Sequence, residues 1–128
     1  MKLSTPDRRP LTPGELYLLL ALSSGAGHAY NLRNRIWSLS QGAVEVSSGA
    51  FTGLRVRLQE IGYIELLEIR PAGKSGTPRR HYGISEHGLI RLKEELVRLR
   101  HAVKIAENAG LFDDETPLDI QKLILDAR

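Results

Sequence analysis

Residues 47–62 read SSGAFTGLRVRLQEIG, and residues 63–84 continue YIELLEIRPAGKSGTPRRHYGI. In the first stretch the apolar side chains recur at helical spacing, and Gly62 is typical of a residue that ends a helix; they are Phe51, Leu54, Leu58 and Ile61. In the second stretch a Gly- and Pro-rich loop separates the β-favouring runs 63–69 and 79–84, which predicts a β-hairpin. A helix followed by a hairpin is the second half of a winged helix.

Two further helices are predicted before this stretch. Thr12, Pro13 and Glu15 form a capping-box signature at the start of an apolar run that ends at residues 23–27. A second helix is expected over residues 28–39, with its inward side chains four and three positions apart at Leu32, Ile36 and Leu39. Residues 44–46, Val-Glu-Val, alternate like a very short strand. The order helix, helix, short strand, helix, hairpin predicts a winged helix-turn-helix.

The chain after the hairpin has the pattern of a dimerisation element. Ser85 is expected to cap a long helix that ends near Asn108. Its apolar residues follow a heptad-like rhythm, which favours packing against a second copy, with packing inside the same subunit as the alternative; the predicted dimer interface is Leu89, Leu92, Leu96, Leu99 and Val103. Thr116 and Pro117 predict a final short helix.

The predicted fold is therefore mainly α with a small β-hairpin, a winged helix-turn-helix followed by C-terminal dimerisation helices. We expect a flexible N-terminal arm over residues 1–11, a winged-helix DNA-binding domain over residues 12–86, and dimerisation helices over residues 87–128. The 128 residues carry 18 Lys and Arg against 15 Asp and Glu. Residues 1–88 hold eleven of these cations against seven acids, whereas residues 89–128 hold seven against eight. A basic N-terminal region suits a polyanion-binding module.

The absence of cysteine excludes disulfides, thiolate zinc sites and thiol catalysis, and it fits a reducing compartment. The start of the sequence lacks a secretory h-region, and its longest apolar run, residues 16–22, is too short to span a bilayer. We therefore expect a cytoplasmic protein without membrane contact. The four His residues lack metal-ligand spacing, and no nucleophile elbow, P-loop or dinucleotide motif occurs. We expect neither enzyme activity nor a cofactor nor a metal site.

Four motifs, in order, resemble the PadR family of transcription regulators. They are the Leu-rich first helix with Gly27-His28-Ala29-Tyr30, then Ser48-Gly49-Ala50-Phe51, then residues 57–64 (RLQEIGYI), and finally residues 76–88 (GTPRRHYGISEHG). The resemblance covers about residues 16–96 and implies a DNA-binding homodimer that pairs through its C-terminal helices. It departs from the family pattern at Ala29, Thr52, Gly53 and Arg55. These departures leave the operator sequence open.

Candidate DNA contacts lie on the third helix and on the hairpin. With the apolar stripe turned inward, the groove-facing half of the helix presents Ser48, Gly49, Thr52, Arg55 and Val56. The hairpin adds Lys74, Thr77, Arg79 and Arg80, which suit phosphates or a minor groove. Arg8, Arg9, Arg33 and Arg35 are further candidates for phosphate contact. The alternative is that these cations are merely solvated.

The function predicted is a DNA-binding transcriptional regulator, a repressor that acts as a homodimer on a pseudo-palindromic operator. An interaction adaptor, whose basic hairpin meets an acidic protein, is the alternative from another class. A regulatory subunit of an enzyme is a third reading without positive support. Trp37 on the second helix is either ordinary packing or part of a site for a small aromatic effector, since some PadR proteins bind flat aromatic compounds.

Overall fold

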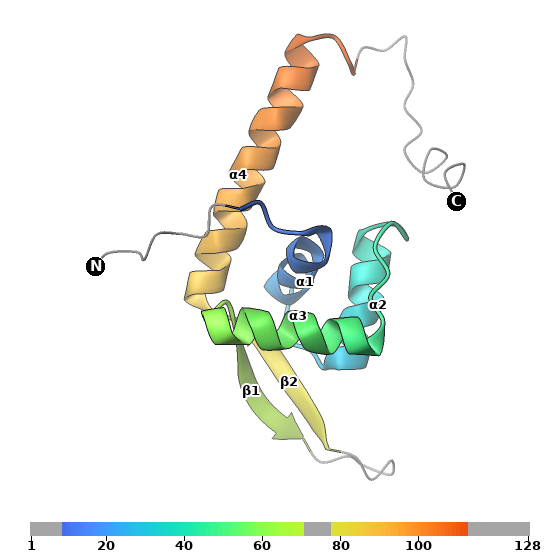
Figure 1. The fold of residues 1–128 in the computed structure, drawn as a ribbon, viewed down its shortest axis with the longest axis vertical. Coiled ribbons are helices and arrows are strands. Elements are labelled where there is room, and N and C mark those ends of the chain that lie inside the picture. Colours follow the sequence, from blue (N-terminus) through green and yellow to red (C-terminus); the bar gives the residue numbers. More distant parts are fainter. Residues whose placement is uncertain (1–8, 71–77, 113–128) are drawn as a thin grey trace.

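In the part of the chain that the structure describes, two helices are followed by a third helix with a hairpin at its end and by a long fourth helix (Figure 1). The computed structural model describes residues 9–70 and 78–112. Their elements are α1 (Pro13–Ser23), α2 (Ala29–Leu39), α3 (Ser48–Ile61), β1 (Ile64–Arg70), β2 (Arg79–Ile84) and α4 (Glu86–Asn108). The prediction of a mainly helical winged helix-turn-helix is confirmed. The predicted hairpin loop and the final short helix lie outside the described residues.

Short polar side chains begin the helices, as the sequence predicts. At α1 the Thr12 hydroxyl accepts from the Glu15 backbone N–H at 3.2 Å, and the Glu15 carboxylate accepts from the Thr12 N–H at 2.9 Å. This reciprocal pair is a capping box. Ser47 caps α3 and Ser85 caps α4 through the same kind of side-chain acceptor. Gly62 ends α3 with a φ of 94°, a left-handed conformation that favours glycine.

The core surrounds α1, which packs against α2, α3 and α4. Leu18, Leu19, Leu32, Ile36 and Leu58 are its largest fully buried side chains. Phe51 and Leu54 on α3 face the same core, so the predicted inward stripe is confirmed at these positions. Leu39 and Ile61 were predicted to face inward as well, but they are 50% and 43% exposed. Both stand at the last residue of their helix, beyond the neighbouring helices that would cover them.

The hairpin hangs below α3 in Figure 1 and is joined to the start of α2 by backbone pairing. β1 and β2 are antiparallel, with a register shift between Leu66 and Glu68. Gly27 and Tyr82 exchange two backbone hydrogen bonds of 3.1 and 2.9 Å. A side chain at position 27 would approach Asn31 within 2.7 Å. This close pairing therefore suits glycine.

The predicted short strand at residues 44–46 is wrong. The described residues hold no backbone partner strand for this segment, which is an extended loop before α3. Val46 is buried and Val44 packs against the core, whereas Glu45 is exposed, which accounts for the alternating pattern. The Ser40 hydroxyl holds the loop by accepting from the Val44 N–H at 2.9 Å.

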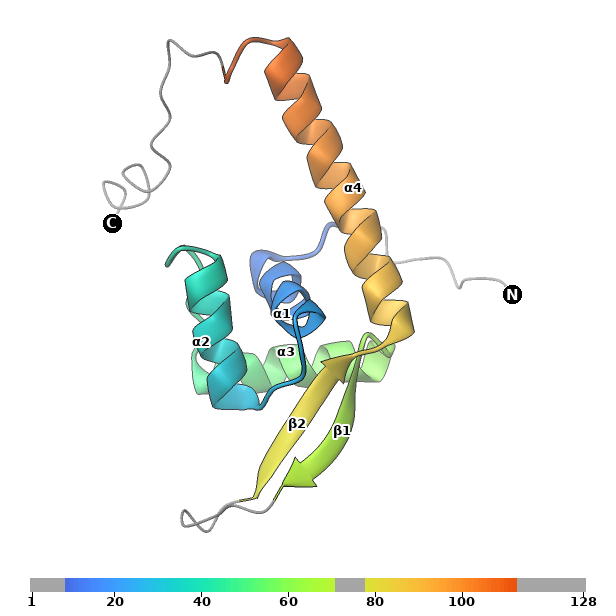
Figure 2. The ribbon, with the colours of Figure 1, turned by 180° about the vertical axis from the view of Figure 1, so that it is seen from behind.

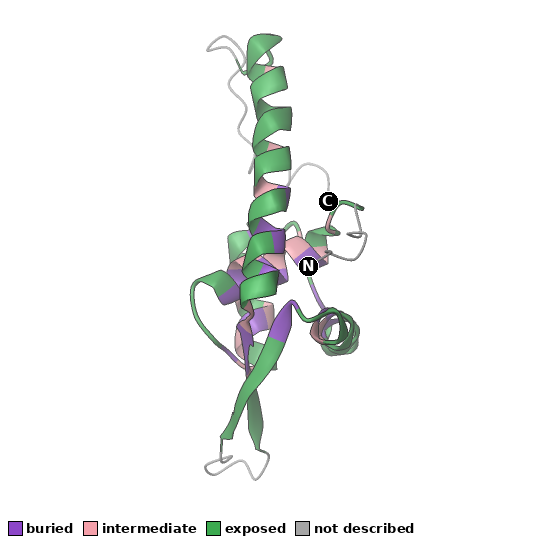
Figure 3. Cartoon of the chain, turned by 90° about the vertical axis from the view of Figure 1, so that its left-hand side faces the viewer, coloured by how far each residue is buried: buried purple, intermediate pink, exposed green. Residues whose placement is uncertain are grey.

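The long helix α4 leaves the body of the protein after its first half, as Figure 2 shows from behind. Leu92 is 2% exposed within the core and Leu96 packs against it. Beyond these residues the helix is mostly exposed along its length (Figure 3). The first half of α4 therefore packs against the winged-helix core.

Candidate nucleic-acid interface

The outer face of α3 presents the side chains that the sequence predicts for base reading. Ser48, Gly49, Thr52 and Val56 are exposed. The Thr52 hydroxyl donates to the Ser48 carbonyl at 3.0 Å, so its donor is engaged with the helix backbone. A Cβ added at Gly49 or Gly53 would meet no other atom within 4 Å. Packing within this chain therefore does not require glycine at either position. The missing side chains leave the backbone of α3 open to close approach by a partner.

Arg55 occupies a different environment from the other α3 candidates. Its side chain is half-buried, and its guanidinium lies over the Tyr82 ring at 5.6 Å from the centroid. Such a position is favourable because the ring face attracts a cation. Arg55 also donates to the Gln59 side chain at 3.3 Å. Both contacts hold Arg55 beside β2, so the structure joins this predicted base reader to the hairpin.

The two strands of the hairpin differ in charge and polarity. β2 begins with Arg79 and Arg80, which are both exposed. β1 carries Glu65 and Glu68, and Glu68 pairs with Arg70 at 2.7 Å on the same strand. The cationic surface of the described hairpin is therefore on β2. Lys74 and Thr77 lie outside the described residues.

A pocket of about 350 Å³ lies between the start of α2, the outer face of α3 and β2. Of the described residues in its lining, three are arginines, four carry aromatic rings and none carries a carboxylate. The lining residues are His28, Ala29, Tyr30, Phe51, Thr52, Arg55, Pro78, Arg79, Arg80 and Tyr82. Sequence reasoning missed His28 and Tyr30 as members of this surface. The available signal was the motif Gly27-His28-Ala29-Tyr30, whose glycine brings α2 to the hairpin through its pairing with Tyr82.

His28 connects the start of α2 to the hairpin. Its Nδ1 accepts from the Asn31 backbone N–H at 3.4 Å, which makes it the N-cap of α2. Its Nε2 lies 3.4 Å from Arg79 Nη1, and its ring meets the His81 ring edge-on at 5.4 Å. Burial, and then the charges of Arg79, His81 and Arg35, lower the pKa of His28 below 6.5.

Two of the further candidates for phosphate contact form hydrogen bonds that stabilise the fold. Arg35 donates to the Ala21, Gly25 and Ala26 carbonyls at 3.1, 2.7 and 2.9 Å, where it satisfies the end of α1 and the turn after it. Arg33 donates to the Val46 carbonyl at 2.8 Å and fastens the loop before α3. These hydrogen bonds occupy part of each guanidinium, and phosphate contact by Arg33 and Arg35 stays a prediction. The carbonyl of Arg9 accepts from Arg91 at 2.6 Å, and Arg8 lies outside the described residues.

The predicted dimer seam divides between two environments. Leu92 belongs to its own subunit's core, so we correct its assignment to a partner surface, and Leu96 is half-buried against the same core. Leu89 is 36% exposed, Leu99 is partly exposed and Val103 is 47% exposed. The heptad-like pattern runs along the whole of α4, but only the first half of the helix packs against its own core. The second half extends beyond that core.

The described residues include no group of three His, Asp or Glu side chains that fits a metal ion. Within the same ranges, no helix combines the length and apolar character needed to cross a membrane. Trp37 is 41% exposed on α2 and is not among the residues that line the pocket. The aromatic effector therefore stays a prediction.

Comparison with known proteins identifies the fold. No protein-family model matches the sequence, and no curated protein matches it either. A PadR-like transcriptional regulator from Bacillus cereus superposes with a TM-score of 0.57 at 25% identity, covering 78% of this chain and 92% of its own. A PadR family transcription regulator from Clostridium difficile gives a TM-score of 0.61 at 14% identity, covering 73% and 94%. A transcriptional regulator from Clostridium thermocellum gives 0.59 at 19% identity, covering 73% and 86%. The chain thus has the winged-helix fold of PadR-like regulators.

Proposed function

We propose that this PadR-like winged-helix protein is a DNA-binding transcriptional regulator that acts as a homodimer. The observation that carries the proposal is the adjacency of an open, uncharged α3 face to the cationic β2. Ser48, Gly49, Thr52 and Val56 supply the face, and Arg79 and Arg80 supply the charge. A helix that enters a major groove needs such a face, and a hairpin beside it meets the phosphates.

In this proposal α3 reads the bases and the hairpin positions the protein. The Thr52 and Val56 methyl groups suit a thymine methyl, and the glycines at positions 49 and 53 admit the helix closely. Ser48 and the free N–H groups at the start of α3 suit a phosphate oxygen. Arg79 and Arg80, with Lys74 and Thr77 on the connecting loop, supply affinity that does not depend on sequence.

The outer half of α4 is the proposed dimer surface. Leu99 and Val103 remain accessible there, Leu89 lies at the helix start, and α4 projects from the body where a second copy can reach it (Figure 3). A twofold dimer presents two α3 helices to successive major grooves and matches a pseudo-palindromic operator. We propose repression by occupation of a promoter, in the cytoplasm.

A second candidate is an interaction adaptor, favoured by the outer strand of the hairpin. Leu66, Leu67 and Ile69 on β1 are 39%, 52% and 56% exposed, beside Glu65 and Glu68. An apolar and acidic strand is unsuited to DNA and suited to a protein partner. The two candidates place their partners on opposite strands of the hairpin.

Duplex binding discriminates between them. Fluorescence anisotropy with the region upstream of the protein's own coding sequence, against a scrambled duplex of equal length, is expected to show at least tenfold tighter binding to the former. The matched variant is Thr52→Glu on α3, which should abolish the preference, with Glu45→Gln in the exposed loop as control. Equal, weak binding to both duplexes at several salt concentrations would favour the adaptor.

A further inference from the structure

We propose that the pocket between α2, α3 and β2 binds a phosphate group, which either the DNA backbone or a free phosphorylated small molecule supplies, so that the two compete. The DNA half of this inference rests on the proposed function, whereas the free-ligand half does not. The pocket contains His28 and Tyr30 from α2, Arg55 from α3, and Arg79 and Arg80 from β2.

His28 and Arg79 bring two nitrogen groups within 3.4 Å of each other at the pocket. A neutral imidazole that accepts at Nδ1, as His28 does from Asn31, carries its proton on Nε2. That N–H lies 3.4 Å from Arg79 Nη1, which is also a donor. A phosphate oxygen placed between the two groups can accept from both, and both hydrogen bonds are charge-assisted because the acceptor is an anion.

The other two arginines of the pocket, Arg55 and Arg80, differ in how they are held. Arg55 is fixed by its contact with the Tyr82 ring and its hydrogen bond to Gln59, so little conformational freedom is lost when it meets an anion. Among the described residues none forms a hydrogen bond or an ion pair with the Arg80 side chain. Among the described residues of the lining, three are arginines and none carries a carboxylate that would neutralise them. This arrangement attracts an anion.

The start of α2 adds a helix dipole to the same site. Ala29 and Tyr30 open an eleven-residue helix and line the pocket, so the start of α2 lies beside it. The positive end of the helix dipole favours an anion there. Together with the arginines, it makes the pocket suited to an oxyanion with several acceptor oxygens.

The size and the aromatic walls of the pocket also suit a free phosphorylated small molecule. A volume of about 350 Å³ is at the lower end of the range of small-ligand sites. Phe51 and Tyr82 are buried in its wall, and Tyr30 is 67% exposed at its rim. These rings leave room for a group attached to the phosphate. A free ligand held there lies between α3 and β2, on the surface proposed for DNA, and therefore inhibits duplex binding.

Nuclear magnetic resonance on the full chain tests the pocket directly. Inorganic phosphate and adenosine monophosphate are titrated against chloride at matched ionic strength, with the His28 ring and the Arg55 and Arg79 side-chain signals as readouts. We expect saturable shifts with phosphate and none with chloride. Arg80→Gln should weaken phosphate binding at least threefold, whereas Arg100→Gln, on the exposed side of α4, should leave it unchanged. Identical shifts with phosphate and chloride would overturn the proposal.

A competition experiment separates this inference from the proposed function. At fixed ionic strength, replacing chloride by phosphate should raise the duplex dissociation constant of the wild type several-fold, and Arg55→Gln should remove that difference. Duplex binding without any saturable phosphate shift would refute the pocket and keep the proposed function. Saturable phosphate binding in a protein that binds no duplex would refute the proposed function and support the free-ligand half.

Discussion

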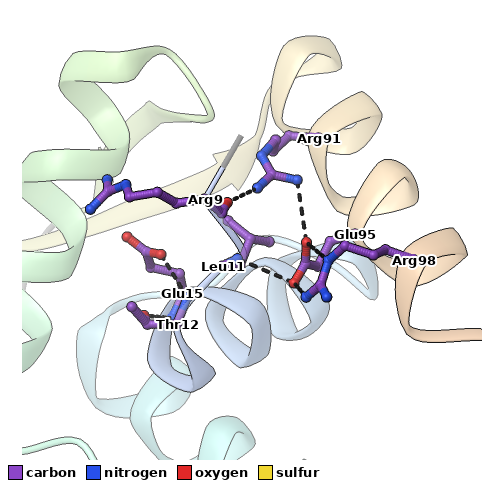
Figure 4. Close-up of polar contacts among 7 residues, drawn as sticks. All are labelled: Arg9, Leu11, Thr12, Glu15, Arg91, Glu95 and Arg98. Carbon is purple, nitrogen blue, oxygen red and sulfur yellow. Dashed lines mark hydrogen bonds and ion pairs between the residues drawn. The ribbon is translucent and has the colours of Figure 1, made fainter. Parts of the chain in front are cut away.

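Glu95 of α4 accepts a hydrogen bond of 3.2 Å from the backbone N–H of Leu11, 84 positions earlier in the chain, and is only 2% exposed (Figure 4). Arg98 donates to the same carboxylate at 2.5 Å, and Arg91 pairs with it at 3.6 Å. Arg91 also donates to the Arg9 carbonyl at 2.6 Å. Residues 9–11, which the sequence assigned to a flexible arm, are thus fastened to α4. This network holds α4 against the start of α1 and sets the direction in which α4 leaves the body.

Removal of the Glu95 carboxylate should destabilise the protein strongly. Glu95→Ala removes the acceptor of the Leu11 N–H and the counter-charge of the buried Arg91 guanidinium, which keeps only the Arg9 carbonyl as a partner. Loss of one partner from such a buried pair is expected to lower the free energy of unfolding by about 3 kcal/mol. Urea unfolding at one protein concentration measures the change.

The control for this variant is Glu94→Gln, on the exposed side of α4. A surface substitution of this kind should change the free energy of unfolding by less than about 0.5 kcal/mol. Equal midpoints for the two variants would show that the network contributes nothing.

The Glu95 carboxylate should also make the stability of the protein depend on pH in the acidic range. The Arg98 hydrogen bond, followed by the Arg98 charge, holds the pKa of Glu95 below 4.5 against the opposing effect of burial. A carboxyl with a lowered folded-state pKa contributes stability above its ordinary pKa and loses it as pH falls through the folded value. The urea midpoint of the wild type should therefore drop more steeply below pH 4.5 than that of Glu95→Gln. Parallel curves for the two proteins would contradict this.

A substitution on the open face of α3 should change protein stability and duplex binding in opposite directions. Gly53→Ala adds a methyl group that meets no atom of this chain. It also removes glycine from a helix interior, so it should stabilise the protein by up to about 1 kcal/mol. If α3 approaches DNA closely, the same methyl group should weaken duplex binding several-fold. Thermal unfolding and anisotropy measure the two effects.

Asn34→Ala on the exposed side of α2 is the control for Gly53→Ala, because it improves helix propensity outside the proposed interface. It should stabilise the protein and leave duplex binding unchanged. A stabilised Gly53→Ala protein with unchanged duplex affinity would argue against close approach.

The arginines of β2 should control the salt dependence of duplex binding. Replacing Arg79 and Arg80 by Ala is expected to weaken binding to all sequences and to reduce the slope of log K against log salt by about one for each lost phosphate contact. The double variant Arg100→Ala, Lys104→Ala removes the same charge from the exposed side of α4 and should keep the slope. An unchanged slope in the β2 variant would remove the hairpin from the binding surface.

The outer half of α4 should govern association. Val103 is 47% exposed, and Val103→Asp places a charge in the proposed apolar seam, which should shift the protein from dimer to monomer at micromolar concentration. Sedimentation velocity measures the change. His101→Asp, about half a turn away and also exposed, is the control and should leave the dimer intact. A wild type that sediments as a monomer at this concentration would contradict the proposed dimer.

Most of the element boundaries could be predicted because the signals that set them are local. Thr12, Ser47 and Ser85 satisfy N–H groups three residues later, and Gly62 ends α3 in the left-handed conformation that glycine adopts most readily. The spacing of apolar residues gave wrong predictions where a segment has no packing or pairing neighbour. Leu39 and Ile61 continue their stripes past the last packing neighbour, and residues 44–46 alternate without a strand to pair with.

The site was predicted less completely, since it depends on contacts between residues far apart. A guanidinium looks the same in a sequence whether it caps a helix, as Arg35 does, or lies over an aromatic ring, as Arg55 does. Distinguishing them requires knowing which carbonyls and rings lie nearby. The pairing of Gly27 with Tyr82, which brings His28 into the pocket, carries no local signature of its partner.

Residue order thus determined the helices, the hairpin and the outward face of α3, because capping, turn formation and periodicity act over a few neighbouring positions. Packing determined which cations remain available, where α4 leaves the core, and that α2, α3 and β2 enclose a common pocket. These features arise from the burial of one apolar cluster around α1, whose geometry places the remaining polar groups beside one another.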